Sequence, residues 1–79
     1  MSPSYEAYLE EFIDLVFTKA AVRWTWAEFA KRAGVSYSTV YNLGTYKTKR
    51  PQLRTALLLC QAAGVEMPPV LRRKLRVVA

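Results

Sequence analysis

Apolar residues recur every three or four positions along most of the chain, a pattern that predicts an all-α fold of five helices and no strand. The first predicted helix runs from about residue 3 to residue 22. Three acidic residues on this helix, Glu6, Glu10 and Asp14, are expected to face the solvent. Its buried stripe is predicted to contain Tyr5, either Tyr8 or Leu9, Phe12, Ile13, Val16 and Phe17.

Capping signals define two short helices in the next part of the chain. Thr25 and Glu28 have the spacing of a capping box, in which each side chain accepts a hydrogen bond from the backbone amide of the other residue. Gly34 is predicted to end this helix in a left-handed conformation. Ser36 is predicted to cap the following helix, which extends to about Leu43.

Two further helices complete the predicted architecture. One begins at Pro51, because proline suits the first turn of a helix, and ends at Gly64. The other runs from Pro68 or Pro69 to about Arg76. The chain has 79 residues, and we expect residues 1–79 to form a single domain.

Charge is distributed unevenly along the chain. Residues 1–28 have a net charge of −3, whereas residues 29–79 carry ten Lys or Arg against Glu66 alone and have a net charge of +9. The total is +6. This asymmetry predicts a surface that faces a polyanion, although an ordinary basic surface is the simpler interpretation.

Composition argues against most kinds of enzyme. The chain has no histidine, and it has no glycine loop for phosphate and no visible pair of nucleophile and base. Its single cysteine, Cys60, cannot form an internal disulfide and is interpreted as a buried helix residue. No apolar run approaches the ~20 residues of a membrane span, and no signal-peptide pattern is present. We expect a cytoplasmic protein with no enzyme activity, cofactor, metal, membrane contact or small-molecule ligand.

Residues 25–45 have the spacing of a helix-turn-helix motif. Such a motif needs a small residue where its helices touch, a glycine in the turn and apolar residues at fixed offsets. Ala30 supplies the small contact and Gly34 the turn. A plain α-hairpin also uses a glycine turn, but it does not explain the cationic loop that follows, residues 46–51. The apolar offsets are Phe29, Ala33, Val35, Val40 and Leu43.

Because of these residues, the segment from residue 25 to residue 65 resembles the lambdoid phage repressor and Cro family of helix-turn-helix domains, the Xre-like group. The resemblance extends through Lys47, Thr48, Lys49, Arg50 and Pro51 to Leu57, Ala62, Ala63, Gly64 and Val65. It implies a compact five-helix, lambda-repressor-like domain that binds operator DNA, usually as a symmetric dimer. It also implies a bacterial cell or a phage-infected host as the setting.

The sequence departs from the family at three positions. Family members often have glutamate where Gly44 stands and glycine where Tyr46 stands, which leaves the path of the following loop open. Trp26 occupies a position often held by a polar residue that touches phosphate. It therefore either contacts phosphate or packs against its neighbours.

The resemblance places base recognition on one short helix, at Ser36, Tyr37, Ser38, Tyr41 and Asn42. The chemistry of these side chains agrees in part, because an asparagine can bond adenine twice and a serine can serve either type of base. The helix has no Lys or Arg, which are the commonest contacts to guanine. We therefore expect contacts that favour A·T pairs, with water or DNA shape contributing to discrimination.

Phosphate contacts are predicted around the cationic loop, with base contacts supplying specificity and phosphate contacts supplying affinity and register. The predicted phosphate contacts are Lys47, Lys49 and Arg50, assisted by Thr48, Gln52, Arg54, Thr25 and Trp26. A second half-site roughly 34 Å away would require a homodimer on DNA. The dimer interface is predicted to contain Val70, Leu71, Val77 and Val78, or else the surplus apolar residues of the first helix.

These observations favour a sequence-specific transcriptional regulator of double-stranded DNA, of the phage or mobile-element repressor type, on a pseudo-palindromic operator. One alternative is an antitoxin-type autorepressor controlled by a protein partner. Another is a helical interaction module that does not bind DNA, which would show no salt-dependent DNA binding.

Overall fold

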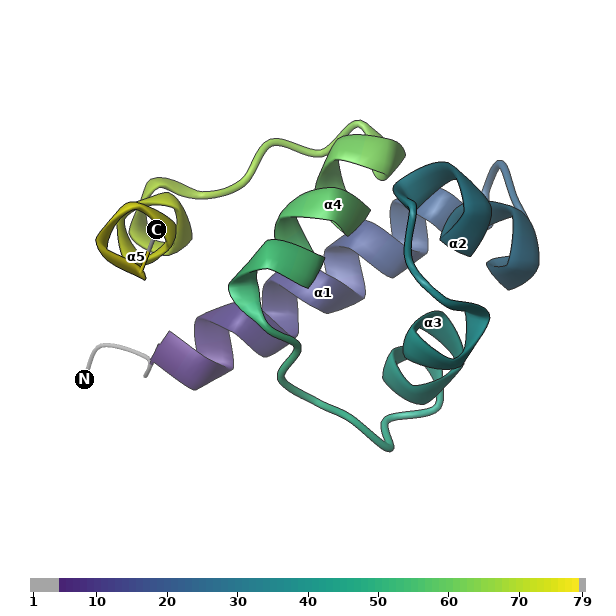
Figure 1. The fold of residues 1–79 in the computed structure, drawn as a ribbon, viewed down its shortest axis with the longest axis horizontal. Helices are drawn as coiled ribbons and strands as arrows, with labels where there is room; N and C mark the ends of the chain where they lie inside the picture. The colour runs from purple at the N-terminus through teal and green to yellow at the C-terminus, as the bar shows by residue number, and fades with distance from the viewer. Residues whose placement is uncertain (1–4, 79) are drawn as a thin grey trace.

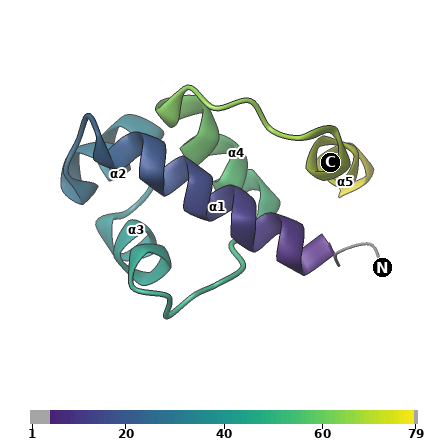
Figure 2. The same ribbon diagram turned by 180° about the vertical axis from the view of Figure 1, so that it is seen from behind.

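The computed structural model describes the backbone of residues 5–78 and the side chains of residues 7–73. This part of the chain contains five helices and no strand, which confirms the predicted all-α class. Figure 1 and Figure 2 show α1 running along the molecule against α4, with α2 and α3 at one end and α5 at the other. The helices are α1 (Tyr5–Ala21), α2 (Trp26–Ala33), α3 (Tyr37–Gly44), α4 (Leu53–Ala63) and α5 (Pro69–Val78).

The start of α4 and the end of α5 each differ by two residues from the sequence-based boundaries, since α5 ends at Val78 and not at Arg76. The prediction that α4 begins at Pro51 is wrong, because Gln52 keeps an extended backbone with φ −60° and ψ 148°, and α4 begins at Leu53. The loop between α3 and α4 therefore covers residues 45–52. The predicted first residues of α1, 3 and 4, lie outside the described residues.

The core is built from apolar residues of all five helices and of the segment before α5. The alternative between Tyr8 and Leu9 is resolved in favour of Leu9, which is 3% exposed, whereas Tyr8 is 40% exposed. Burying a side chain of this size contributes about 1.5–3 kcal/mol. The buried residues are Leu9, Phe12, Ile13, Val16, Ala20, Phe29, Ala30, Ala33, Val40, Leu43, Ala56, Leu59, Cys60, Met67 and Leu71.

Aromatic packing fixes α2 on α1. Phe29 of α2 has no exposed surface, and its ring meets the edge of Phe17 on α1 at a centroid distance of 5.6 Å. Trp24, in the turn between the two helices, stacks parallel to the Phe29 ring at a centroid distance of 6.3 Å. Such contacts add about 0.5–1.5 kcal/mol to the stabilisation that comes from buried area, so α2 is held in a fixed position on α1.

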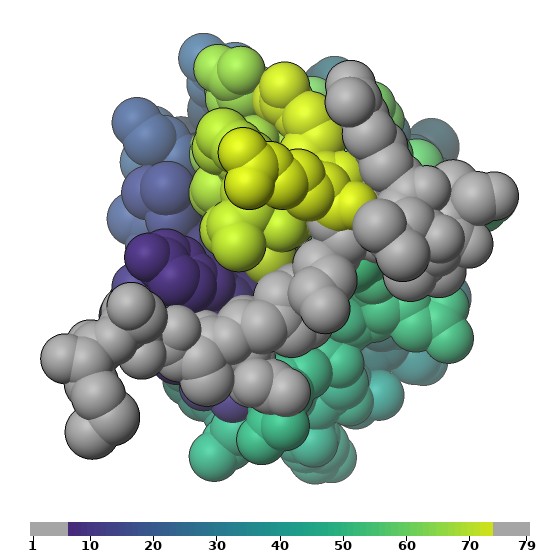
Figure 3. Space-filling model, turned by 90° about the vertical axis from the view of Figure 1, so that its left-hand side faces the viewer, coloured from purple at the N-terminus to yellow at the C-terminus, as the bar shows by residue number. Residues whose placement is uncertain are grey.

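At the other end of the molecule, α5 is held by Leu71. This side chain has no exposed surface, so its predicted place in a dimer interface is wrong: it is a core residue. Figure 3 looks on to this end, where the segment leading into α5 covers the surface beside the first turns of α1. Val70 is 40% exposed and stays available to a partner. The side chains of Val77 and Val78 lie outside the described residues.

Cys60 lies in the core as expected. Its Sγ donates to the carbonyl oxygen of Leu57 at 3.1 Å, and burial raises the pKa of the thiol above its usual value. Among the described residues, no helix combines the length and the apolar character of a membrane span.

Candidate nucleic-acid interface

The turn between α2 and α3 is closed by backbone hydrogen bonds. Gly34 adopts a left-handed conformation with φ 75°, and its amide donates to the carbonyl oxygen of Ala30 at 3.0 Å. The amide of Val35 donates to the same oxygen at 3.1 Å. Ser36 then caps α3, because its hydroxyl accepts from the amide of Thr39 at 3.1 Å. The direction of α3 relative to α2 is therefore set within three residues.

The capping box at the start of α2 is confirmed. The Thr25 hydroxyl accepts from the amide of Glu28 at 3.2 Å, and the Glu28 carboxylate accepts from the amide of Thr25 at 3.3 Å. The Thr25 hydroxyl also donates to this carboxylate, at 3.1 Å. The hydroxyl hydrogen of Thr25 therefore already has an acceptor in Glu28, so it is less available for the predicted contact with phosphate.

One side of α3 is buried and the other is open to solvent. Val40 and Leu43 pack into the core, whereas Tyr37, Ser38 and Tyr41 are exposed. Of the remaining predicted base contacts, Ser36 is exposed with its hydroxyl engaged in the cap, and Asn42 is half-buried. The structure thus brings these positions together on one face of α3.

The tyrosine ring at position 41 is held from three directions. Its centroid lies 6.1 Å from the Tyr37 ring and 6.0 Å from the Trp26 ring, which it meets at 81°. The ammonium group of Lys47 lies 5.3 Å from the same centroid, within the range of a cation–π contact. The exposed face of α3 is therefore an aromatic surface with a cation at its edge.

Trp26 packs against its neighbours, which is one of the two roles that its sequence position left open. Its ring meets the edge of Phe17 at 6.4 Å and also covers the backbone of Gly44. A Cβ atom at position 44 would lie only 2.5–2.9 Å from three atoms of the indole. The glycine is thus required by the tryptophan, and the two residues fix the end of α3 against α2.

The loop after α3 turns through an unusual backbone conformation. Tyr46 has φ 63°, in the left-handed region that favours glycine, so it is a strained position for a tyrosine. The amide of Thr48 donates to the carbonyl oxygen of Asn42 at 3.0 Å, which returns the loop to α3. The loop therefore stays close to the end of α3, although its residues 45–50 are all exposed.

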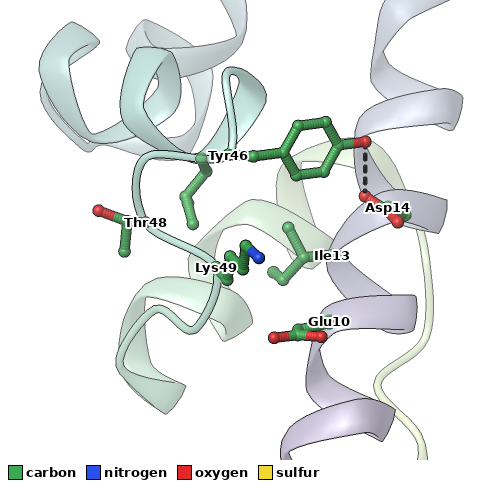
Figure 4. A pocket seen from close by; sticks show the side chains of 7 residues that line it. Glu10, Ile13, Asp14, Tyr46, Thr48 and Lys49 are labelled. Carbon is green, nitrogen blue, oxygen red and sulfur yellow. Dashed lines mark hydrogen bonds between the residues drawn. The ribbon is translucent and has the colours of Figure 1, made fainter.

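Side chains of this loop contact the acidic side of α1. The Tyr46 hydroxyl donates to Oδ1 of Asp14 at 3.4 Å, and Nε of Arg50 lies 3.5 Å from Oε1 of Glu10. In Figure 4 the Lys49 side chain lies in the open cleft between these contacts, which has a volume of about 230 Å³. The prediction that Glu10 and Asp14 simply face solvent is therefore incomplete.

Sequence reasoning missed Glu10, Asp14 and Tyr46 as parts of this site. The signal that could have found the acids is their spacing, because residues four apart lie on one side of a helix. A cationic loop elsewhere in a small domain is a natural partner for such a pair. The loop returns to α1 through the left-handed conformation of Tyr46, and no local sequence pattern predicts that conformation.

A second hollow is lined both by residues predicted to contact bases and by residues predicted to contact phosphate. It has a volume of about 250 Å³, lies between α3 and the start of α4, and is lined in part by Asn42, Thr48, Arg50 and Gln52. Thr48 and Gln52 are exposed, as is Arg54 two residues further on, and in Figure 4 the Thr48 side chain points away from α1. Polar groups able to bond bases or phosphates therefore surround this hollow.

The chemistry available here is that of a binding surface. It offers hydroxyl, amide, aromatic and cationic groups on α3 and the following loop. Within the described residues, no group of three or more potential metal ligands lies close together. Comparison of the chain with family models, with curated proteins and with solved structures gives no match.

Proposed function

We propose that this chain is a transcriptional regulator that binds specific sequences in double-stranded DNA, of the repressor and Cro type found in phages and mobile elements. The observation that carries the proposal is the surface of α3. It presents Tyr37, Ser38 and Tyr41 to solvent beside the cationic loop of Lys47, Lys49 and Arg50. This is the arrangement that a helix-turn-helix needs to contact bases and neighbouring phosphates together.

The dimensions of α3 support the proposal. An α-helix with its side chains is about 10–12 Å across, which fits the ~12 Å width of the DNA major groove. The three-residue turn and the contact between Trp26 and Gly44 hold this helix at both ends. A helix fixed in this way can present the same side chains to successive base pairs without a cost for ordering them.

The side chains of α3 favour A·T base pairs. The Tyr37 and Tyr41 rings offer apolar surface to a thymine methyl group, and Asn42 offers both a donor and an acceptor to adenine. Asn42 is half-buried and lines the hollow beside α4. Because α3 has no Lys or Arg, it lacks the commonest contact to guanine.

A second copy of the chain would supply the second half-site. Val70 on α5 is one exposed apolar position that fits such an interface. Tyr8 and Leu15 are 40% and 46% exposed and lie seven residues apart, so they share one side of α1, and Val22, which directly follows the helix, is 84% exposed. Val70→Glu and Leu15→Glu separate the two surfaces, because only the substitution in the true interface would reduce dimer formation in sedimentation experiments.

The experiment that tests the function is selection of binding sites from a randomised duplex DNA pool at near-physiological salt. An inverted repeat with half-sites about 34 Å apart is the expected result and would establish a dimeric regulator. A single short site would instead indicate a monomer on DNA. No enrichment, with weak and strongly salt-dependent retention, would contradict sequence specificity.

Variants sharpen this test by separating the two kinds of contact. Ser38→Ala should change the selected base at one position, whereas Lys49→Ala should weaken binding to every sequence and reduce the salt slope by about 0.9. Lys19→Ala is the matched control for the lost charge. Lys19 is exposed on α1, five residues from Asp14 and therefore about 140° around the helix from the loop.

A further inference from the structure

Two acidic residues of α1 hold the loop that carries the proposed phosphate contacts. Glu10 and Asp14 are one helical turn apart, and each meets a side chain of the loop. Glu10 pairs with Arg50 at 3.5 Å, and Asp14 accepts from the hydroxyl of Tyr46 at 3.4 Å. Because α1 lies outside the α2–α3 pair, these contacts connect a separate helix to the proposed DNA surface.

Figure 4 shows how closely the loop and the acids are associated. Lys49 extends into the cleft that Glu10, Ile13, Asp14 and Tyr46 also line, so its ammonium group lies on the same side of the loop as the two carboxylates. Two of the cations assigned to phosphate, Lys49 and Arg50, are thus directed at α1 in the free protein. Lys47, which stacks on Tyr41, is directed at α3 instead.

The strength of the Arg50–Glu10 pair decides what DNA would do to it. The two side chains are 60% and 40% exposed, and exposed ion pairs of this kind contribute about 0–1 kcal/mol. A phosphate with two available oxygens can displace such a partner from a guanidinium group. The carboxylate would then remain within the ~8 Å screening length of the phosphate and repel it.

We propose that Glu10 competes with DNA phosphate for Arg50 and thereby limits the affinity of the protein for DNA. This inference rests on the proposed function. Glu10 acts as a positioning residue: it does not touch DNA, but it sets whether Arg50 is directed at α1 or at the phosphate. Phosphate contacts contribute to affinity whatever the DNA sequence. By weakening them, the acidic side of α1 keeps the affinity for DNA dependent on base contacts.

Replacing the carboxylate by an amide tests the competition. Glu10→Gln preserves the size of the side chain and should tighten binding to a random-sequence duplex by about two- to fivefold at low salt, the range expected for one exposed pair. Arg50 would then neutralise its phosphate without the opposing charge of the Glu10 carboxylate nearby. The slope of log K against log salt should therefore steepen by up to about 0.9.

Glu11→Gln is the matched control. It removes the same charge from the neighbouring residue, which is exposed and lies about 100° around α1 from Glu10. Both variants change the net charge equally, so the difference between them measures the contact with Arg50. In an Arg50→Ala background, Glu10→Gln and Glu11→Gln should have the same effect on binding. Thermal unfolding of each variant checks that the fold is retained.

The possible results separate this inference from the function on which it rests. If the wild type binds DNA but Glu10→Gln and Glu11→Gln give the same affinity and salt slope, the competition is wrong and the proposed function stands. Weaker binding by Glu10→Gln would also overturn it, because the carboxylate would then be holding Arg50 in the orientation that phosphate needs. If no variant binds any duplex, both proposals fail together.

Discussion

The turn that leads into α3 has three residues and is closed by its own backbone, whereas the loop that leads out of α3 has eight residues and combines backbone hydrogen bonds to α3 with two side-chain contacts to α1. In the turn, Gly34 takes the left-handed conformation that suits it, and Ser36 caps the next helix. In the loop, the left-handed position is occupied by a tyrosine, and both contacts to α1 are exposed.

This difference separates two requirements of the proposed DNA surface. Base contacts need side chains held in one geometry, and a short turn with satisfied backbone groups provides that. Phosphate contacts tolerate adjustment, because charge attracts over several ångströms. A loop held by weak, exposed contacts can therefore rearrange on DNA at little cost, while α3 stays fixed by the turn and by Trp26.

The largest effect is expected where α3 ends. Gly44→Ala places a Cβ atom 2.5–2.9 Å from the indole of Trp26, so the ring must move and lose its contacts with Phe17 and Tyr41. Overpacking of this kind costs about 1–3 kcal/mol. Denaturant unfolding of the variant measures the change in the free energy of unfolding.

A double-mutant cycle identifies the cause of that loss. In a Trp26→Ala background the clash is absent, and alanine is a better helix former than glycine by about 1 kcal/mol. Gly44→Ala should therefore stabilise the protein in this background, although it destabilises the wild type. An equal loss of stability in both backgrounds would mean that the requirement for glycine at position 44 has a cause other than Trp26.

The second effect, about 1–2 kcal/mol, is expected in the turn. Gly34→Ala forces a left-handed alanine, while its Cβ meets no other atom within 4 Å, so the cost is conformational only. Gly64→Ala is a close control, because Gly64 has φ 73° and equally open surroundings at the end of α4. Both should lose similar stability in urea, but only Gly34→Ala should alter the base preference of α3.

These residues also show which parts of the molecule the sequence could predict. Gly34, Ser36 and the capping box of Thr25 are local signals, since each residue bonds a neighbour within a few positions, and all three were identified correctly. The packing of Trp26 on Gly44 and the contact of Tyr46 with Asp14 join residues 18 and 32 positions apart. Such contacts depend on how helices are placed in space, and one sequence does not encode them in a local pattern.

A comparison of the two helix starts should give an effect of about 1 kcal/mol. Ser36→Ala removes a side-chain cap and should destabilise α3 by this amount. Gln52→Ala should change stability by only a few tenths, because Gln52 makes no capping hydrogen bond at the start of α4. Thermal unfolding distinguishes them, since ~1 kcal/mol shifts the midpoint by about 4–8 °C in a domain of this size. Equal losses would contradict the view that only the turn is fixed by local chemistry.

The smallest effect concerns the hydroxyl that joins the loop to α1. Tyr46→Phe removes the hydrogen bond to Asp14, which is 3.4 Å long and exposed, so the free energy of unfolding should fall by less than about 0.5 kcal/mol. Tyr8→Phe is the control, since Tyr8 is half-exposed on α1 about 120° around the helix from Asp14. Hydrogen exchange at the Thr48 amide provides a more sensitive readout, because this amide closes the loop on α3. Exchange should be faster in Tyr46→Phe and unchanged in Tyr8→Phe. A loss above 1 kcal/mol would mean that the loop is as firmly fixed as the turn, and the contrast between the two segments would fail.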